Sequence, residues 1–136
     1  MNATNGQVLN GVVVDGMGIG AKKVALLMAG LVKCPAVAGL EGIVFFPGTL
    51  NVQLEHDWPT PETGGVRVGK EVYGGDGDVL LFPCVLEVGN KKAECFIVRP
   101  EKTSHPDGLV EVVAALGLRE YLQATTGSTL SIHFSL

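Results

Sequence analysis

The sequence predicts a mainly β domain folded as a small closed or nearly closed barrel. Nineteen glycines and seven prolines divide the 136 residues into short pieces. Most of those pieces are rich in apolar and β-branched residues, which favours strands. Segments with the character of a helix are few. Many short strands with few helices are typical of small barrels, because closure removes the exposed edges of a sheet.

The expected strands begin with Val8 to Val14, a valine-rich run after a polar start. Leu80 to Val88 and Ala93 to Val98 flank the turn-forming pair Gly89-Asn90, and together they predict a hairpin. Pro83 within the first of these runs indicates a sheet edge or a bulge, because proline has no backbone N–H to donate.

The C-terminal part of the chain adds two strands and a helix. Leu109 to Val113 is a β-rich run, and Leu130 to Phe134 alternates apolar and polar residues as a half-buried strand does. Leu118 to Ala124 is long enough for two helical turns. Val24 to Val32 is apolar without a clean period, so it fits a buried strand, a helix, or one followed by the other.

Two polar segments predict loops. His56 to Gly65 reads as a surface loop from its composition. Gly74 to Asp78 contains two aspartates, but the ladder of ligands that a calcium-binding EF-hand loop needs is absent. A solvated turn is the better interpretation of this second segment.

Composition and charge narrow the classes of function. Hydrophobic residues make up 46% of the chain and the net charge is −4, so a folded core is expected and a nucleic-acid coat is not. We expect no signal peptide, and the longest apolar run, Val24 to Val32, is too short to span a membrane. Cys34, Cys84 and Cys95 have no paired spacing, which favours three reduced thiols in a cytoplasmic protein.

Two segments could bind a nucleotide and its metal. Gly16 to Gly20 places three glycines after a strand and before Lys22 and Lys23, where backbone N–H groups could surround a phosphate. A tight turn explains the same glycines. Thr49 and Asn51 are two residues apart in an extended segment, so they project from one face, and their neutral oxygens suit Mg²⁺ beside nucleotide phosphates. A plain polar strand face is the alternative.

Two further segments concentrate polar groups. Arg99 to His105, followed by Glu111, gathers donors, acceptors and one imidazole in a loop between strands. Leu116 to Glu120 begins the short helix, where backbone N–H groups and Arg119 could meet a phosphate or a base. An ordinary solvated surface explains each segment equally well when it is taken alone.

The order of these segments resembles the archaeal CTP-dependent riboflavin kinase family. That family shows a G-[LM]-G-E-G turn, then P-x-GTLN, then P-x-[KR]-T-x-H, then E-I-I-A-P-x-x-LR. The corresponding segments here are Gly16 to Gly20, Pro47 to Asn51, Pro100 to His105 and Glu111 to Arg119. The resemblance covers nearly the whole chain.

The resemblance implies a fold and an activity. The family fold is a small six-stranded cradle-loop barrel (riboflavin-kinase-like) with one or two short helices, here a single domain over residues 1–136 in which Lys22 to Met28 is extended. The implied reaction transfers the γ-phosphoryl of CTP to the 5′-hydroxyl of riboflavin and gives FMN and CDP. Mg²⁺ is the implied cofactor. We expect a cytoplasmic monomer without nucleic-acid or membrane partners.

The resemblance also assigns roles to individual residues. Thr49 and Asn51 would bind the metal, Thr103 and Glu111 would hold the flavin, and Glu111 is the first choice for a catalytic base. The residues that would bind the nucleotide are Gly16, Met17, Gly18, Ile19, Gly20, Ala21, Leu116, Gly117, Leu118 and Arg119.

One departure from the family pattern keeps a second interpretation open. Ile19 stands where the family has glutamate, beside the expected phosphates, and Ala115 stands where it has proline. A non-catalytic relative that binds a flavin or a nucleotide would tolerate the loss of that charge. A barrel that binds DNA is disfavoured by the net charge of −4.

Overall fold

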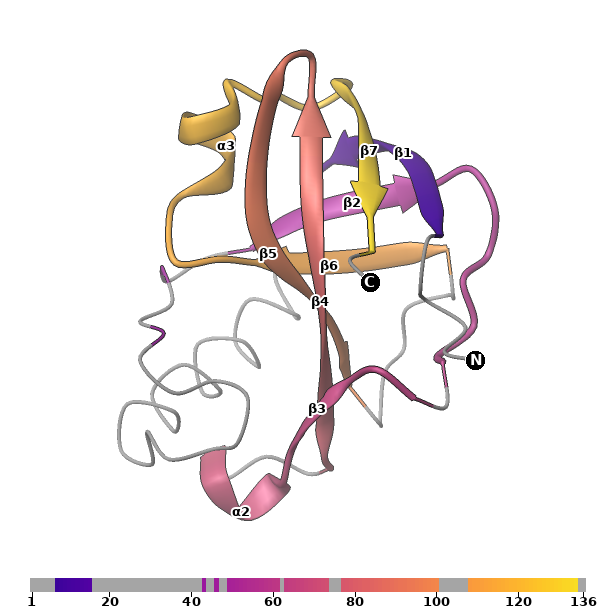
Figure 1. Cartoon of the computed structure of the whole chain (residues 1–136), viewed down its shortest axis with the longest axis vertical. Helices are drawn as coiled ribbons and strands as arrows, with labels where there is room; N and C mark the ends of the chain where they lie inside the picture. Colours follow the sequence, from indigo (N-terminus) through magenta and orange to yellow (C-terminus); the bar gives the residue numbers. More distant parts are fainter. Residues whose placement is uncertain are drawn as a thin grey trace.

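The described part of the chain is built around one antiparallel sheet (Figure 1). The structure is a computed structural model, and it describes residues 7–15, 43, 46, 49–61, 63–73, 77–100 and 108–134. In this part the strands are β1 (Val8–Val14), β2 (Leu50–Leu54), β3 (Val66–Val68), β4 (Val79–Val88), β5 (Lys91–Pro100), β6 (Leu109–Val113) and β7 (Thr129–His133), and the helices are α2 (Lys70–Tyr73) and α3 (Leu118–Leu122).

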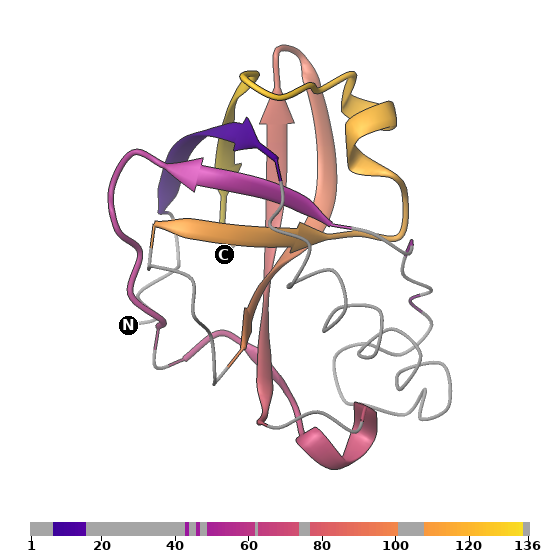
Figure 2. The same ribbon diagram turned by 180° about the vertical axis from the view of Figure 1, so that it is seen from behind.

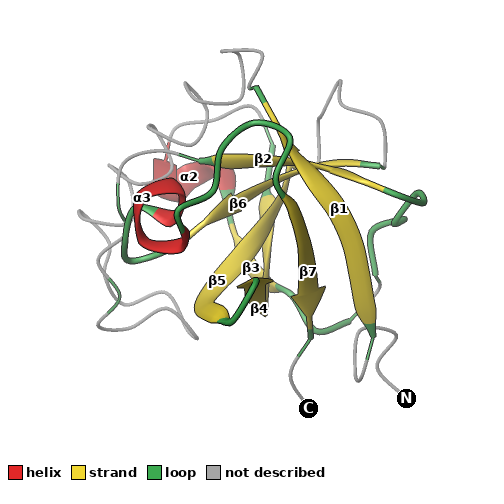
Figure 3. Ribbon diagram, turned by 90° about the horizontal axis from the view of Figure 1, so that it is seen from above, coloured by secondary structure: helices red, strands yellow, loops and turns green. Residues whose placement is uncertain are grey.

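Six of these strands pair into a closed ring. The sheet order is β3-β4-β5-β6-β2-β1-β7. An additional pairing between β4 and β7 closes the ring. Seen from above, the strands surround a common interior (Figure 3). The prediction of a mainly β fold with few short helices is confirmed. The short strand β3 is an addition to the ring and was not anticipated.

Strand β4 can serve two partners on one edge because it is ten residues long. Its first residues, Val79 to Leu81, pair with β3, and residues 85–87 pair with β7. Pro83 lies between the residues that pair with β3 and those that pair with β7. On the opposite edge of β4, Pro83 pairs with Phe96 of β5. A proline is tolerated there because neither β3 nor β7 extends to this position, so no strand on that edge requires a backbone N–H from it.

The hairpin of β4 and β5 forms as the sequence predicts. Val88 pairs with Lys91 across the turn, and Gly89 has a φ of +59°, a conformation that glycine adopts without steric cost. The pairing continues for ten residue pairs. It places Cys84 directly across from Cys95, with the two Sγ atoms 3.4 Å apart.

Alternate residues of every ring strand fill the interior. Ile132 of β7 and Val52 of β2 are fully buried there, and Leu86 and Ile97 meet them from the hairpin. The alternation expected for the last strand is therefore confirmed. A second, smaller cluster lies between β3 and the ends of β4, β5 and β6, and it contains Val68, Val79, Leu81, Val98 and Val113.

Trp58 corrects the expectation that His56 to Gly65 is only a surface loop. Its side chain is 3% exposed and belongs to the interior cluster. The indole ring meets Phe82 edge-on at 5.3 Å and stacks on Phe134 at 5.4 Å. Arg99 is also buried, and its Nη2 donates to the Trp58 carbonyl at 2.7 Å. The loop thus closes one side of the core.

The helices are short and lie at opposite ends of the molecule (Figure 2). Helix α3 ends two residues earlier than expected, because Gln123 adopts a left-handed conformation with φ 54° and ψ 41°. The segments Val24 to Val32 and Lys22 to Met28 lie outside the described residues. Within the described ranges, no helix has the length and apolar character needed to cross a membrane.

Candidate functional site

The end of β1 is fixed against the turn that precedes β7. The hydroxyl of Thr126 donates to Oδ1 of Asp15 at 2.6 Å, and the N–H of Gly127 donates to the carbonyl of Val13 at 2.8 Å. The glycine-rich segment Gly16 to Ala21 starts at the next residue but lies outside the described residues. Its starting point is therefore held by two hydrogen bonds to one turn.

Asn51 of β2 lies directly across from Glu111 of β6. Their neighbours Leu50, Val52 and Val112 point into the core, so Asn51 and Glu111 project from the opposite face of the sheet. Thr49 precedes β2 by one residue and shares this alternation with Asn51. The carboxylate of Glu111 therefore lies beside Asn51, one of the two residues whose neutral oxygens were expected to bind a metal.

Thr49 and Asn51 provide donors that suit Mg²⁺, because a hydroxyl and an amide oxygen are hard ligands, which Mg²⁺ prefers over nitrogen or sulfur. The carboxylate of Glu111 lies next to Asn51 and adds a negative charge there. Asn51 is 8% exposed, so its amide is sheltered from bulk water. The described residues contain no group of three or more His, Cys, Asp or Glu side chains that could hold a metal by themselves.

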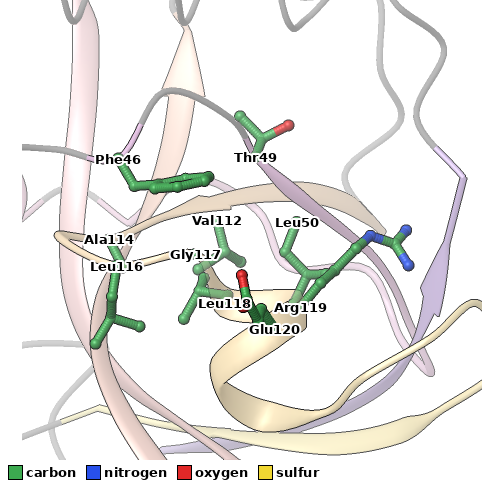
Figure 4. A pocket seen from close by; sticks show the side chains of 10 residues that line it. All are labelled: Phe46, Thr49, Leu50, Val112, Ala114, Leu116, Gly117, Leu118, Arg119 and Glu120. Carbon is green, nitrogen blue, oxygen red and sulfur yellow. The ribbon is translucent and has the colours of Figure 1, made fainter.

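A cavity of about 250 Å³ opens where β2 begins and β6 ends. Its floor is apolar and includes the buried residues Leu50, Val112 and Leu118. Phe46 forms one wall, and its backbone N–H donates to the carbonyl of Ala114 at 2.8 Å. Figure 4 shows the Phe46 ring on one side of this space and the carboxylate of Glu120 pointing into it.

Arg119 also lines the cavity, but its guanidinium extends toward β1 (Figure 4). Nη2 lies 3.4 Å from the carbonyl of Val14, the residue that pairs with Asn51. A cation therefore stands at the end of β1, where the glycine-rich segment begins. Thr49, which stands two residues before Asn51 in the sequence, also lines this cavity.

Comparison with protein families decides the relationship. The model of the CTP-dependent riboflavin kinase family, described as a domain of unknown function (DUF120), matches residues 13–134. The chain belongs to this family.

Riboflavin kinases of archaea are among the similar proteins. The riboflavin kinase of Methanococcus maripaludis strain C5 is 34% identical over 99 residues, which cover 68% of this chain and 76% of the relative. That of Methanothermobacter thermautotrophicus is 38% identical over 91 residues, or 64% and 69% of the two chains. That of Methanospirillum hungatei is 30% identical over 136 residues, which cover 95% of this chain but 58% of the relative.

The structure brings several of the expected riboflavin kinase residues together and leaves others outside its description. Asn51 and Glu111 are partners on adjacent strands, and Thr49 lines a cavity together with the segment Leu116 to Arg119. Gly16 to Ala21 and Thr103 lie outside the described residues. Phe46 and Glu120 also line the cavity, and the sequence segments that contain them were singled out without a role for either residue. Phe46 gave a signal, an aromatic residue directly before the PGTLN segment.

Proposed function

We propose that this chain phosphorylates riboflavin at its 5′-hydroxyl, with CTP as the donor and Mg²⁺ as the cofactor. The observation that carries the proposal is the family match over residues 13–134. The pairing of Asn51 with Glu111, with Thr49 on the same face, supports it because hard oxygen ligands and a carboxylate are what phosphoryl transfer requires.

The proposed reaction follows from these groups. The riboflavin 5′-oxygen forms a bond to the γ-phosphorus while the bond from that phosphorus to the β,γ-bridging oxygen breaks, and CDP leaves. The hydroxyl proton passes to the carboxylate of Glu111. Bound Mg²⁺ would neutralise charge on the phosphates, and Thr49 and Asn51 would hold it. Most of the acceleration then comes from positioning and charge neutralisation, which needs no covalent intermediate.

Each remaining group has a place in this proposal. The backbone of residues 16–21 would surround the phosphates, with Arg119 close to where that segment starts. Thr103 would contact the flavin together with Glu111. The segment Leu116 to Leu118 would contact the nucleoside. We further propose that the enzyme works as a cytoplasmic monomer, which sedimentation of the purified chain and cell fractionation would test.

The decisive experiment incubates the purified chain with riboflavin, Mg²⁺ and either CTP or ATP, and separates FMN from riboflavin by chromatography. FMN formed with CTP and not with ATP is the expected result. Saturable binding of riboflavin or CTP without any FMN would contradict a kinase and support the non-catalytic alternative. In that case Ile19→Glu, which restores the family residue, should be tested for recovered activity.

A further inference from the structure

We propose that Thr126 is a positioning residue for the phosphates and the metal of the proposed reaction. Its hydroxyl holds Asp15 directly after β1, and this contact keeps the end of β1 in place between α3 and β2. The inference rests on the proposed function, because it concerns how the groups of the same site are held in register. No motif in the sequence pointed to either residue, and they are 111 residues apart in the chain.

The turn that carries Thr126 is fixed by its own hydrogen bonds. The N–H of Ser128 donates to the carbonyl of Thr125 at 2.8 Å, and the N–H of Thr125 donates to Oγ of Ser128 at 3.0 Å. Gly127, the third residue of the turn, has a φ of +95°, which is typical of the third position of a type II turn. Thr126 therefore stands at the corner of a turn whose closing hydrogen bonds do not involve Asp15.

This turn binds the end of β1 at three points. The N–H of Val13 donates to the carbonyl of Ser128 at 2.9 Å, and the N–H of Gly127 donates to the carbonyl of Val13 at 2.8 Å. The third contact is the donation from the Thr126 hydroxyl to Oδ1 of Asp15 at 2.6 Å. A hydroxyl that donates to a carboxylate makes a short and strong hydrogen bond. Of the three contacts, this one alone acts beyond the last residue of β1.

The end of β1 touches two groups of the proposed site. Val14 pairs with Asn51, the proposed metal ligand, and its carbonyl lies 3.4 Å from Nη2 of Arg119. The carbonyl of Arg119 in turn accepts the N–H of Ala124, the residue that leads into the turn. In Figure 3 the segment between α3 and β7 passes beside β1. Loss of the hydrogen bond just beyond Val14 would therefore remove a support that Asn51 and Arg119 share.

A small shift at this place is sufficient to affect the reaction. Phosphoryl transfer depends mainly on the positions of the metal and the phosphates, and a displacement of about 1 Å can lower a rate by about 100-fold. Asp15 and Thr126 both lie at the surface, so their contact contributes to position more than to the packing of the core. Its loss should be visible in the kinetics while the fold is retained.

The test replaces Thr126 by valine, which has the same shape without the hydroxyl. FMN formation from CTP should slow by about tenfold, and the Mg²⁺ concentration for half-maximal activity should rise severalfold. Thr126→Ser keeps the hydroxyl and should keep most of the rate. Thr129→Val removes a hydroxyl from an exposed position of β7, and this matched control should behave as the wild type does. The melting temperature of each variant shows whether it is folded.

A double-mutant cycle connects the hydroxyl to its acceptor. Asp15→Ala should slow the reaction as Thr126→Val does, and the combined variant should be no slower than either single variant, since both remove the same contact. Effects that multiply in the combined variant would show that the two residues act independently and would overturn the inference. It is also overturned if Thr126→Val lowers the melting temperature with unchanged kinetics, or if Thr126→Ser is as slow as Thr126→Val.

These outcomes are separable from those of the proposed function. If the wild-type chain makes FMN and Thr126→Val makes it equally fast, the kinase stands and the inference fails. If the wild type makes no FMN but binds CTP with Mg²⁺ in calorimetry, the kinase fails. Weaker binding by Thr126→Val then supports the inference, and equal binding overturns it. If the wild type binds no CTP, both fail.

Discussion

Asn51 faces Glu111 across two strands that are 60 residues apart in the sequence, on the side of the sheet that is turned away from the core. The pairing places the proposed metal ligand Asn51 next to a carboxylate on the adjacent strand. Strands hold side chains more rigidly than loops do, so the relative position of these two groups is set by the ring itself. Each group can be removed separately, which gives two independent predictions.

Replacing Asn51 by alanine should lower the rate of FMN formation by about 100-fold, because a ligand that positions the metal would be lost. The rate should be measured over a Mg²⁺ titration, and the concentration for half-maximal activity should rise. Gln53→Ala is the matched control, since Gln53 projects from the same face of β2 and its side chain donates to the carbonyl of Gly108 at 3.2 Å. Equal rates for the wild type and Asn51→Ala would remove the metal assignment.

Glu111→Gln should lower kcat by between about 10² and 10⁴, because the amide cannot take the hydroxyl proton. Glu111→Asp keeps the carboxylate on a shorter side chain and should retain more activity. Riboflavin binding, followed by quenching of flavin fluorescence, separates catalysis from affinity. If the glutamine variant turns over normally, Glu111 is not the base.

The packing of Trp58 inside the ring allows a prediction about stability. Trp58 contacts Phe82, Phe134 and the Arg99 guanidinium, whose Cζ lies 5.2 Å from the indole centroid. Trp58→Ala should lower the free energy of unfolding by about 3 to 5 kcal/mol, because the large cavity left behind cannot collapse in a closed ring. Denaturant unfolding measures the loss. Tyr121→Ala, at a side chain that is 48% exposed, should cost much less.

The contact between the Cys84 and Cys95 thiols allows a prediction about how the stability of the fold depends on pH. The hydrogen bond to Cys95, together with burial, raises the pKa of the Cys84 thiol well above its usual range. An unfolded thiol ionises near pH 8.5. Above that pH the unfolded chain loses a proton that the folded chain keeps, so folding stability should fall as the pH rises.

Comparison of unfolding at pH 7 and pH 10 checks this effect. The wild type should lose more stability between those values than Cys84→Ala, because lysine and tyrosine titrations are common to both proteins. An equal loss in the two proteins would show that the Cys84 thiol does not contribute.

Much of this architecture follows from local patterns in the sequence. The Gly89-Asn90 turn fixes the hairpin register, and with it the contact between Cys84 and Cys95, since each lies five residues from the turn. That consequence was available from the predicted hairpin. The irregular spacing of the cysteines in the sequence concealed it, because pairing across a hairpin depends on distance from the turn.

Other features depend on contacts between distant segments. The polar residues around Trp58 predict a loop correctly, but nothing local shows that its indole fills the space beside Phe134. Similarly, the sequence shows Glu120 only as a charged residue on a short helix, and the structure is needed to show that it lines the same cavity as Phe46. The motifs therefore singled out Thr49, Asn51 and Glu111, whose roles remain predictions, whereas the positions of Trp58 and Glu120 beside distant residues do not follow from local patterns.

Gly117 allows a prediction that separates binding from stability. Its φ of −73° is accessible to alanine, so Gly117→Ala should not strain the backbone, and the loss of the glycine N-cap of α3 should cost about 1 kcal/mol of stability. The added methyl group would meet the Phe46 ring at 3.2 Å and push it toward the cavity or away from it. We expect KM for CTP to rise severalfold while the melting temperature falls by only a few degrees. A fall in melting temperature with KM unchanged would show that Phe46 supports the fold and not the nucleotide.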